Sequence, residues 1–145
     1  MFESPMECAG ILRDAGISPS PQRLAIFTYL RNHRNHPTAE MIGKEVREQL
    51  PGMSLTTVYN TLKLLVKKNI VHEVIIEDGE LRYDADLRDH GHFKCLSCGE
   101  VYDFFPDEKE LEFLNTSLPE GFRITSTHLC CRGICDKPAC RVPSL

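Results

Sequence analysis

Seven cysteines stand in this sequence of 145 residues, and four of them form two closely spaced pairs. Cys95 and Cys98 make a CxxC pair, and Cys135 and Cys140 make a CxxxxC pair. Four thiolates presented from two tight turns match the tetrahedral coordination that Zn²⁺ prefers in structural sites. We predict such a site, which contributes on the order of 10 kcal/mol to folding. A redox-active CxxC and unpaired cysteines are the alternatives. The remaining thiols lie outside this pattern: Cys8, Cys130 and Cys131.

A second group of side chains offers nitrogen and oxygen ligands. It comprises His36, Asp84, His90, His92 and Asp103. In an extended chain the two histidines of the HxH sequence point the same way. Imidazole and carboxylate ligands suit Fe²⁺ or Mn²⁺ better than thiolate-rich zinc, and five ligands leave one coordination position open. A solvated strand without metal is the alternative interpretation of the HxH sequence.

The segment that begins at Ser54 has the pattern of an amphipathic helix with a polar face. Its apolar positions recur at helical spacing, and its other side carries hydroxyl, amide and ammonium groups that suit the DNA major groove. The candidate DNA-contacting residues are Arg23, Ser54, Thr56, Thr57, Tyr59, Asn60 and Lys63. We expect Tyr59 near base edges and Arg23, at the start of another helix, near the DNA backbone. An ordinary amphipathic helix with a solvated face is the alternative.

The elements that must position these groups begin with helices. Apolar spacing and capping signals predict helices at residues 6–15, after Pro21, after Thr38 and at 54–68. Strand-like residues 70–76 and 81–83 flank the hairpin turn Asp78-Gly79. Helices followed by a hairpin are the pattern of a winged helix-turn-helix, which we predict over residues 1–83.

Residues 84–92 lack periodicity and predict a hinge. Beyond them, residues 93–145 are expected to form a small α/β domain, with strands at 93–94, 101–105 and 122–131 and a helix at 108–117 whose Leu111 and Leu114 point inward. The predicted fold class of the whole chain is therefore α+β. The second domain is too small to build a large core, so we expect it to need a metal or a partner subunit.

Charge is distributed unevenly along the chain. Residues 1–72 contain nine basic and six acidic residues, whereas residues 73–145 contain eight basic and fifteen acidic ones. The first half is thus suited to approach a polyanion and the second to attract cations, although short segments also vary this much by chance.

Composition excludes several classes of protein. Apolar residues make up 41% of the chain and charged residues 26%, which excludes collagen, coiled coil and low-complexity sequence. No apolar run approaches the roughly 20 residues of a membrane span. The N-terminal residues carry Glu3 and Glu7 and no basic segment, so we expect no secretory signal and a cytoplasmic protein. A four-cysteine zinc site is closed to substrate, so we expect no enzyme.

Several motifs, in order and spacing, resemble one family over about residues 8–140. They are Pro21-Gln22-Arg23, His36-Pro37-Thr38-Ala39-Glu40, residues 54–62, Arg82-Tyr83-Asp84, residues 90–99 and Gly133-Ile134-Cys135. Together they resemble the ferric uptake regulator (Fur) family of bacterial metal-responsive repressors. The resemblance implies a winged-helix domain followed by a dimerisation domain, a homodimer, and binding to an inverted-repeat operator in double-stranded DNA. It also implies structural Zn²⁺ and regulatory Fe²⁺ or Mn²⁺.

Within this family the regulatory ligands are similar to those of the peroxide-sensing branch. Iron-uptake regulators usually have glutamate where this chain has Asp84 and Asp103. The resemblance implies that bound Fe²⁺ reacts with hydrogen peroxide and oxidises a ligand histidine, with His36 and His90 at the modified positions. An iron-responsive repressor of iron uptake is the alternative. The last cysteine pair departs from the CxxC common in peroxide sensors, but both spacings occur in the family.

Overall fold

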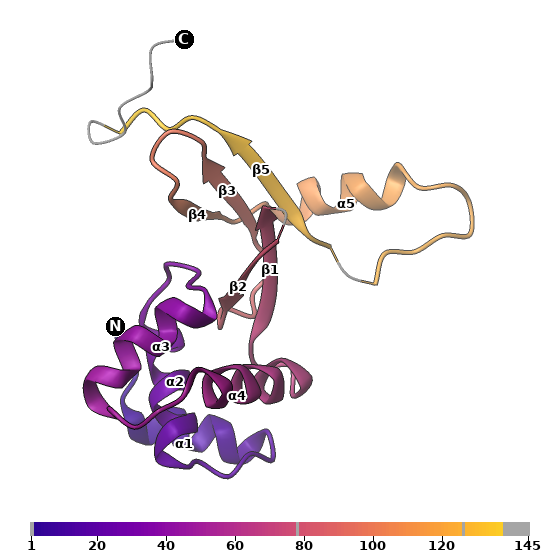
Figure 1. Ribbon diagram of the computed structural model, residues 1–145. Helices are drawn as coiled ribbons and strands as arrows, with labels where there is room; N and C mark the ends of the chain where they lie inside the picture. Colours follow the sequence, from indigo (N-terminus) through magenta and orange to yellow (C-terminus); the bar gives the residue numbers. More distant parts are fainter. Residues whose placement is uncertain (1, 78, 126, 138–145) are drawn as a thin grey trace. The chain divides into compact units, whose positions relative to one another are not determined.

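The computed structural model describes residues 2–77, 79–125 and 127–137. The chain forms two compact units, Met1–Leu87 and Arg88–Leu145. The first contains α1 (Pro5–Asp14), α2 (Pro21–Asn32), α3 (Ala39–Gln49), α4 (Leu55–Lys67), β1 (His72–Glu77) and β2 (Glu80–Asp84). The second contains β3 (Gly91–Cys95), β4 (Val101–Phe104), α5 (Glu108–Thr116) and β5 (Leu129–Gly133) (Figure 1). The predicted α+β class is confirmed.

Each helix of the first unit begins at a hydroxyl side chain that satisfies a free backbone N–H. Ser4, Ser20, Thr38 and Ser54 are the N-caps, and each accepts a hydrogen bond from the backbone N–H three residues later. Pro5 and Pro21 then occupy the first helical position, where the missing N–H costs nothing. These local signals explain why the starts of α2 and α4 follow the sequence prediction.

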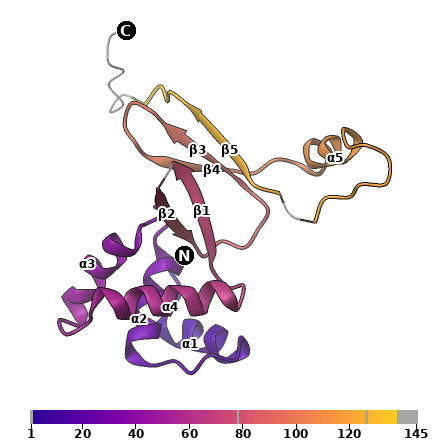
Figure 2. The same cartoon turned by 45° about the vertical axis from the view of Figure 1, so that its right-hand side comes forward.

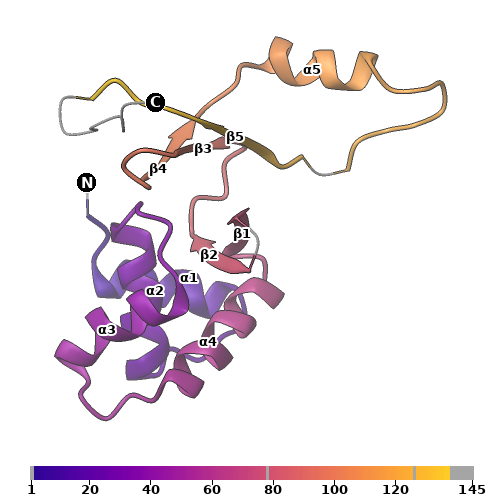
Figure 3. The same cartoon turned by 45° about the horizontal axis from the view of Figure 1, so that its top comes forward.

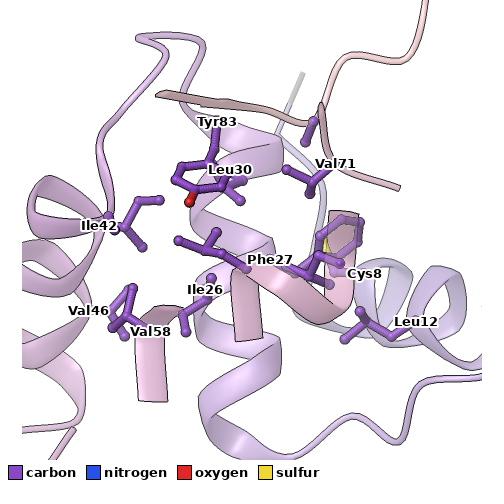
Figure 4. Close-up of a cluster of buried hydrophobic side chains, with 14 of the residues drawn as sticks. Cys8, Leu12, Ile26, Phe27, Leu30, Ile42, Val46, Val58, Val71 and Tyr83 are labelled. Carbon is purple, nitrogen blue, oxygen red and sulfur yellow. The ribbon is translucent and has the colours of Figure 1, made fainter. Parts of the chain in front are cut away.

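The core of the first unit lies where α1, α2, α3 and α4 meet the hairpin of β1 and β2 (Figures 2 and 4). Ile26 and Phe27 of α2 are among its most buried side chains, and Val58 and Leu62 of α4 belong to the same cluster. Tyr83 extends this cluster from β2. The apolar face predicted for the fourth helix is therefore a core face, and the polar face of α4 is left outside.

The first strand of the hairpin starts two residues later than its β-branched sequence predicts. Asn69 adopts a left-handed conformation with φ of 57°, and the N–H of Ile70 bonds to the carbonyl of Leu65. This hydrogen bond closes the C-terminal end of α4. Because the backbone N–H of Ile70 is bonded to α4, the strand begins only after this residue. β1 then pairs antiparallel with β2, which places Asp84 opposite His72 at the open end of the hairpin.

The second unit contains a three-stranded sheet in the order β4-β3-β5 (Figure 3). β3 is antiparallel to β4 and parallel to β5. The expected strand over residues 122–131 was wrong at its start, because the structure forms β5 only from Leu129. Phe122 instead donates its backbone N–H to the carbonyl of Pro119 in a turn and leaves its ring 70% exposed. Among the described residues, the apolar and β-branched side chains of 122–125 have no neighbouring strand with which to pair.

The helix α5 is well capped but poorly covered. Asp107 and Glu110 form a reciprocal capping box at its start. No residue of α5 is buried, and the two leucines expected to point inward, Leu111 and Leu114, are only half-buried. Phe113 is 68% exposed. Capping and helix propensity therefore define α5, while its apolar side chains contribute little to a core within this chain.

Two further features concern the chain as a whole. β2 ends at Asp84 and β3 begins at Gly91, so strands occupy both ends of the segment expected to be a hinge. Its role as a hinge stays a prediction.

Within the described residues, none of the helices combines the length and the apolar character that crossing a bilayer requires.

Candidate metal centres and nucleic-acid interface

The sulfur ligands of the predicted zinc site gather in the second unit. The Sγ atoms of Cys95, Cys98 and Cys135 all lie within 4.8 Å of one another, although 36 residues separate Cys98 from Cys135 in the sequence. The Sγ atoms of Cys98 and Cys135 are 3.9 Å apart. Two sulfurs bound to one tetrahedral Zn²⁺ at about 2.3 Å would lie about 3.8 Å apart. The distance between the Cys98 and Cys135 sulfurs matches this spacing, and Cys140 lies outside the described residues.

Backbone amides prepare this cluster for negative charge. The Sγ atom of Cys95 accepts hydrogen bonds from the backbone N–H groups of Cys98, at 3.5 Å, and Cys135, at 3.4 Å. Gly99, with a φ of 73°, closes the CxxC turn through a bond to the Cys95 carbonyl. Because such bonds favour the thiolate, which is the form that binds metal, the turn is suited to hold an ion. Involvement of a third sulfur favours a metal site over a two-cysteine redox pair.

The other three cysteines lie apart from this cluster. Cys130 and Cys131 are adjacent on β5, where they pair with His92 and Phe93 respectively and so project from opposite faces of the sheet. Cys8 is buried in the core of the first unit, and burial raises the pKa of its thiol. Its surroundings are those of a structural, unreactive cysteine.

One imidazole–carboxylate pair lies in the first unit. The Nε2 atom of His36 is 3.3 Å from Oδ2 of Asp84, and both side chains are buried. The backbone around His36 is tied to β2, because Arg82 donates to the His36 carbonyl and the N–H of Tyr83 donates to the carbonyl of Pro37. His36 itself has a φ of 47°, in the left-handed region that only a few per cent of non-glycine residues adopt.

A second imidazole–carboxylate group lies in the second unit. Oδ1 of Asp103 is 3.7 Å from Nε2 of His90 and 3.6 Å from Nε2 of His92. His92 and Asp103 are directly opposed on β3 and β4, so they share a face of the sheet. The Nδ1 atom of His90 lies 2.5 Å from the carbonyl of Arg88, an arrangement that leaves Nε2 as the ligand atom.

Both groups have donors suited to a hard divalent ion. Ligand atoms about 2.1 Å from one octahedral ion lie about 3.0 Å apart when adjacent and about 4.2 Å apart when opposite. The 3.3 Å separation between His36 and Asp84 and the 3.6 and 3.7 Å separations around Asp103 fall in this range. Imidazole and carboxylate ligands without sulfur favour Fe²⁺ or Mn²⁺.

Glycine is required between the two histidines of the second group. A Cβ atom on Gly91 would lie 2.2 Å from the ring of Phe104, its partner on β4. We expect Gly91→Ala to destabilise the second unit by about 1–3 kcal/mol, because the ring must move. Urea unfolding followed by circular dichroism would measure this.

Gly10→Ala is the matched control for that experiment. No atom lies within 4 Å of the Cβ that it would add, and Gly10 lies inside α1. It should therefore stabilise the first unit by about 0.5–1 kcal/mol. A Gly91→Ala protein that unfolds at the wild-type urea concentration would show that the ring of Phe104 yields at no cost.

The polar face predicted for DNA binding lies on α4. Thr56, Tyr59, Asn60 and Lys63 are exposed there, whereas Thr57 is half-buried. Ser54 and Thr57 also cap the start of α4. Ser54 Oγ accepts a hydrogen bond from the Thr57 backbone N–H, and the two hydroxyls lie 2.9 Å apart. The exposed polar side chains of α4 therefore extend from Thr56 in its first turn to Lys63.

The start of α2 meets this face. Arg23 lines a pocket of about 370 Å³ with Thr57 and Asn60, so three predicted DNA-contacting residues come together. Gln22 also lines the pocket. Gln22 is not among the DNA-contacting residues predicted from the sequence. Its position directly after Pro21, in the first turn of the helix that carries Arg23, is the signal that could have suggested it. Glu40 of α3 was missed as well, and its carboxylate accepts a hydrogen bond from the Tyr59 hydroxyl.

The sequence and the fold of this chain were compared with those of known proteins. The profile of the Ferric uptake regulator family matches residues 14–132. The "Peroxide operon regulator" of Bacillus subtilis is 36% identical over 132 residues, which are 90% of each chain. The ferric uptake regulator of Vibrio cholerae superposes with a TM-score of 0.73 at 28% identity, covering 88% of this chain and 98% of that one. The ferric uptake regulator of Pseudomonas aeruginosa with manganese gives a TM-score of 0.72 at 26% identity, covering 90% and 98%. This chain belongs to the ferric uptake regulator family.

Proposed function

We propose that this protein is a metal-dependent transcriptional repressor that senses hydrogen peroxide. The observation that carries the proposal is the pair of sulfur-free ligand groups, His36 with Asp84 and His90 with His92 and Asp103. Relatives that are named as peroxide regulators support the same assignment. The protein acts in the cytoplasm and is a regulator, not an enzyme.

The thiolate cluster holds the structural zinc. Cys95, Cys98 and Cys135, joined by Cys140, supply four sulfurs to one Zn²⁺. The three-stranded sheet and the exposed α5 provide few buried apolar side chains among the described residues, so the second unit depends on this ion for stability. The exposed apolar side chains of α5 and the sheet are covered by a second copy of the chain in a homodimer.

The two sulfur-free groups together hold one regulatory Fe²⁺ or Mn²⁺. Bound Fe²⁺ supplies the one-electron chemistry that reduces hydrogen peroxide. One oxygen atom of the peroxide would be added to the imidazole of His36 or His90 while the other would leave as water, and the oxidised imidazole would be a weaker ligand. Asp84 and Asp103 have carboxylates one methylene shorter than the glutamates usual in iron-uptake regulators, and this difference favours peroxide sensing over the alternative function of an iron-uptake repressor.

Metal binding is coupled to DNA binding through the arrangement of the two units. Residues of both units ligate one ion, so the ion favours one angle between them. In a homodimer that angle sets the separation of two α4 helices, which must match half-sites about one helical turn, roughly 34–36 Å, apart. The metal shifts this equilibrium only by its differential affinity for the two arrangements.

The helix α4 reads an inverted-repeat operator in double-stranded DNA. Tyr59 approaches base edges, Thr56, Thr57, Asn60 and Lys63 contact bases or phosphates, and Ser54 caps the helix end nearest to them. Arg23 approaches the backbone beside Thr57 and Asn60, with which it shares a pocket. Phosphate contacts set the position and the salt dependence of binding, and base contacts set its sequence preference.

Salt dependence tests this interface directly. We expect Lys63→Ala to reduce the slope of log affinity against log salt concentration by about one unit, because one phosphate contact is lost. Fluorescence anisotropy of the Mn²⁺-loaded protein on selected DNA measures the slope. Lys109→Ala, which removes an exposed charge from α5, should leave it unchanged. Equal slopes for Lys63→Ala and the wild type would place Lys63 away from the phosphates.

A further inference from the structure

Tyr59 and Glu40 form a hydrogen-bonded pair at the surface of the first unit. The hydroxyl of Tyr59, on α4, donates to Oε1 of Glu40, on α3, at 2.6 Å. Such a short O–H···O distance is typical of a bond to a charged acceptor. Both side chains remain exposed, and Tyr59 keeps 37% of its surface accessible. The pair is therefore part of the face that α4 offers to DNA.

Glu40 is held in place by the start of α3. It is the second residue of that helix, where the helix dipole stabilises a carboxylate. The N-cap, Thr38, forms a β-bridge with Arg82, so the position of the helix start is tied to β2. The hydrogen bond from Tyr59 lowers the pKa of Glu40 below its ordinary value, and the backbone N–H of Glu40 lowers it further. At neutral pH this carboxyl group is ionised.

The charge of Glu40 decides how Tyr59 can bond to anything else. A carboxylate is only an acceptor, and a phenol has one proton to donate. The Tyr59 proton is therefore committed to Glu40, and the lone pairs of the phenol oxygen remain for another partner. We infer that Tyr59 reads DNA as a hydrogen-bond acceptor, and that Glu40 is a specificity-determining residue because it imposes that polarity. This inference rests on the proposed function of α4.

An acceptor in the major groove selects a donor. The exocyclic amino groups of adenine and cytosine are the donors exposed there, whereas thymine and guanine present acceptors at the corresponding positions. The negative charge of Glu40 would also be repelled by phosphate, so the pair faces the bases instead of the backbone. The preferred base opposite Tyr59 is therefore adenine or cytosine.

Selection from a library of randomised DNA duplexes tests this assignment. The Mn²⁺-loaded full chain should enrich adenine or cytosine over thymine or guanine by about tenfold at one position of each half-site. Tyr59→Phe removes the acceptor and should abolish that preference alone. Glu40→Ala frees the hydroxyl proton, so Tyr59 can donate and thymine or guanine should rise at the same position. Glu48→Ala removes an exposed charge elsewhere on α3 and should select the wild-type sequence.

Two results would overturn the inference. One is an unchanged base preference at every position in both Glu40→Ala and Tyr59→Phe. The other is an unchanged Tyr59 pKa in Glu40→Ala, because the hydrogen bond to Glu40 raises that pKa and its loss should return it toward the ordinary value. Titration of ¹³C-labelled tyrosine by NMR measures this without DNA. If the titration succeeds but the wild type enriches no DNA sequence, the proposed function has failed and the reading role of the pair fails with it.

Discussion

Cys95→Ser protein should contain almost no zinc, and residues 91–137 should lose their native sheet. The Sγ atom of Cys95 accepts two backbone hydrogen bonds and belongs to the three-sulfur cluster, so its loss removes both a ligand and an organising acceptor. Structural zinc contributes on the order of 10 kcal/mol, more than the roughly 3–5 kcal/mol that the hydrophobic core of so small a unit supplies. Elemental analysis and hydrogen exchange of β3 and β5 measure the two effects.

Cys131→Ser provides the matched control. Cys131 is exposed on β5 beside Phe93 and belongs to neither ligand group, so its substitution should leave the zinc content and the exchange of β3 unchanged. The hydrogen exchange of α2 and α4 should stay native in both variants, because the core of the first unit contains neither residue. One zinc per chain together with native exchange in Cys95→Ser would exclude the assignment of this cluster.

The second large effect is expected on treatment with hydrogen peroxide. The Fe²⁺-loaded protein should lose at least tenfold in DNA affinity and gain one oxygen on His36 or His90, because oxidation weakens a metal ligand. The Mn²⁺-loaded protein should keep its DNA affinity, since Mn²⁺ reacts poorly with peroxide. Anisotropy and peptide mass spectrometry on the same samples give both readouts. His33, which belongs to neither ligand group, serves as an internal control and should gain no oxygen.

A conservative substitution separates peroxide sensing from iron sensing. Asp103→Glu lengthens the carboxylate that lies beside both His90 and His92. We expect this variant to retain metal-dependent DNA binding and to respond weakly to peroxide. Release of the Fe²⁺ form without added oxygen on His36 or His90, accompanied by oxidation of Cys95 and zinc loss, would refute the histidine mechanism.

The sequence alone predicts the features of this protein that depend on residues close together in the chain. The spacing of Val58, Leu62 and Leu65 determines which face of α4 is buried, and Ser54 determines where the helix starts. The His-Gly-His sequence places two imidazoles near each other, and a CxxC turn places two thiols together, because only a few residues separate the groups. These features depend on backbone periodicity and capping, which operate within about one helical turn.

Only the tertiary structure decided which distant segments meet. Phe122 looks strand-like but pairs with no strand in the part of the chain that the structure describes, whereas Leu129 pairs in a parallel arrangement with Gly91, 38 residues away in the sequence. The approach of Cys135 to Cys95, the ring of Phe104 over Gly91, and the bond from Tyr59 to Glu40 likewise join separate elements. Strand pairing and side-chain contact depend on the packing of the whole unit, and local preference for a strand or a helix does not specify the partner.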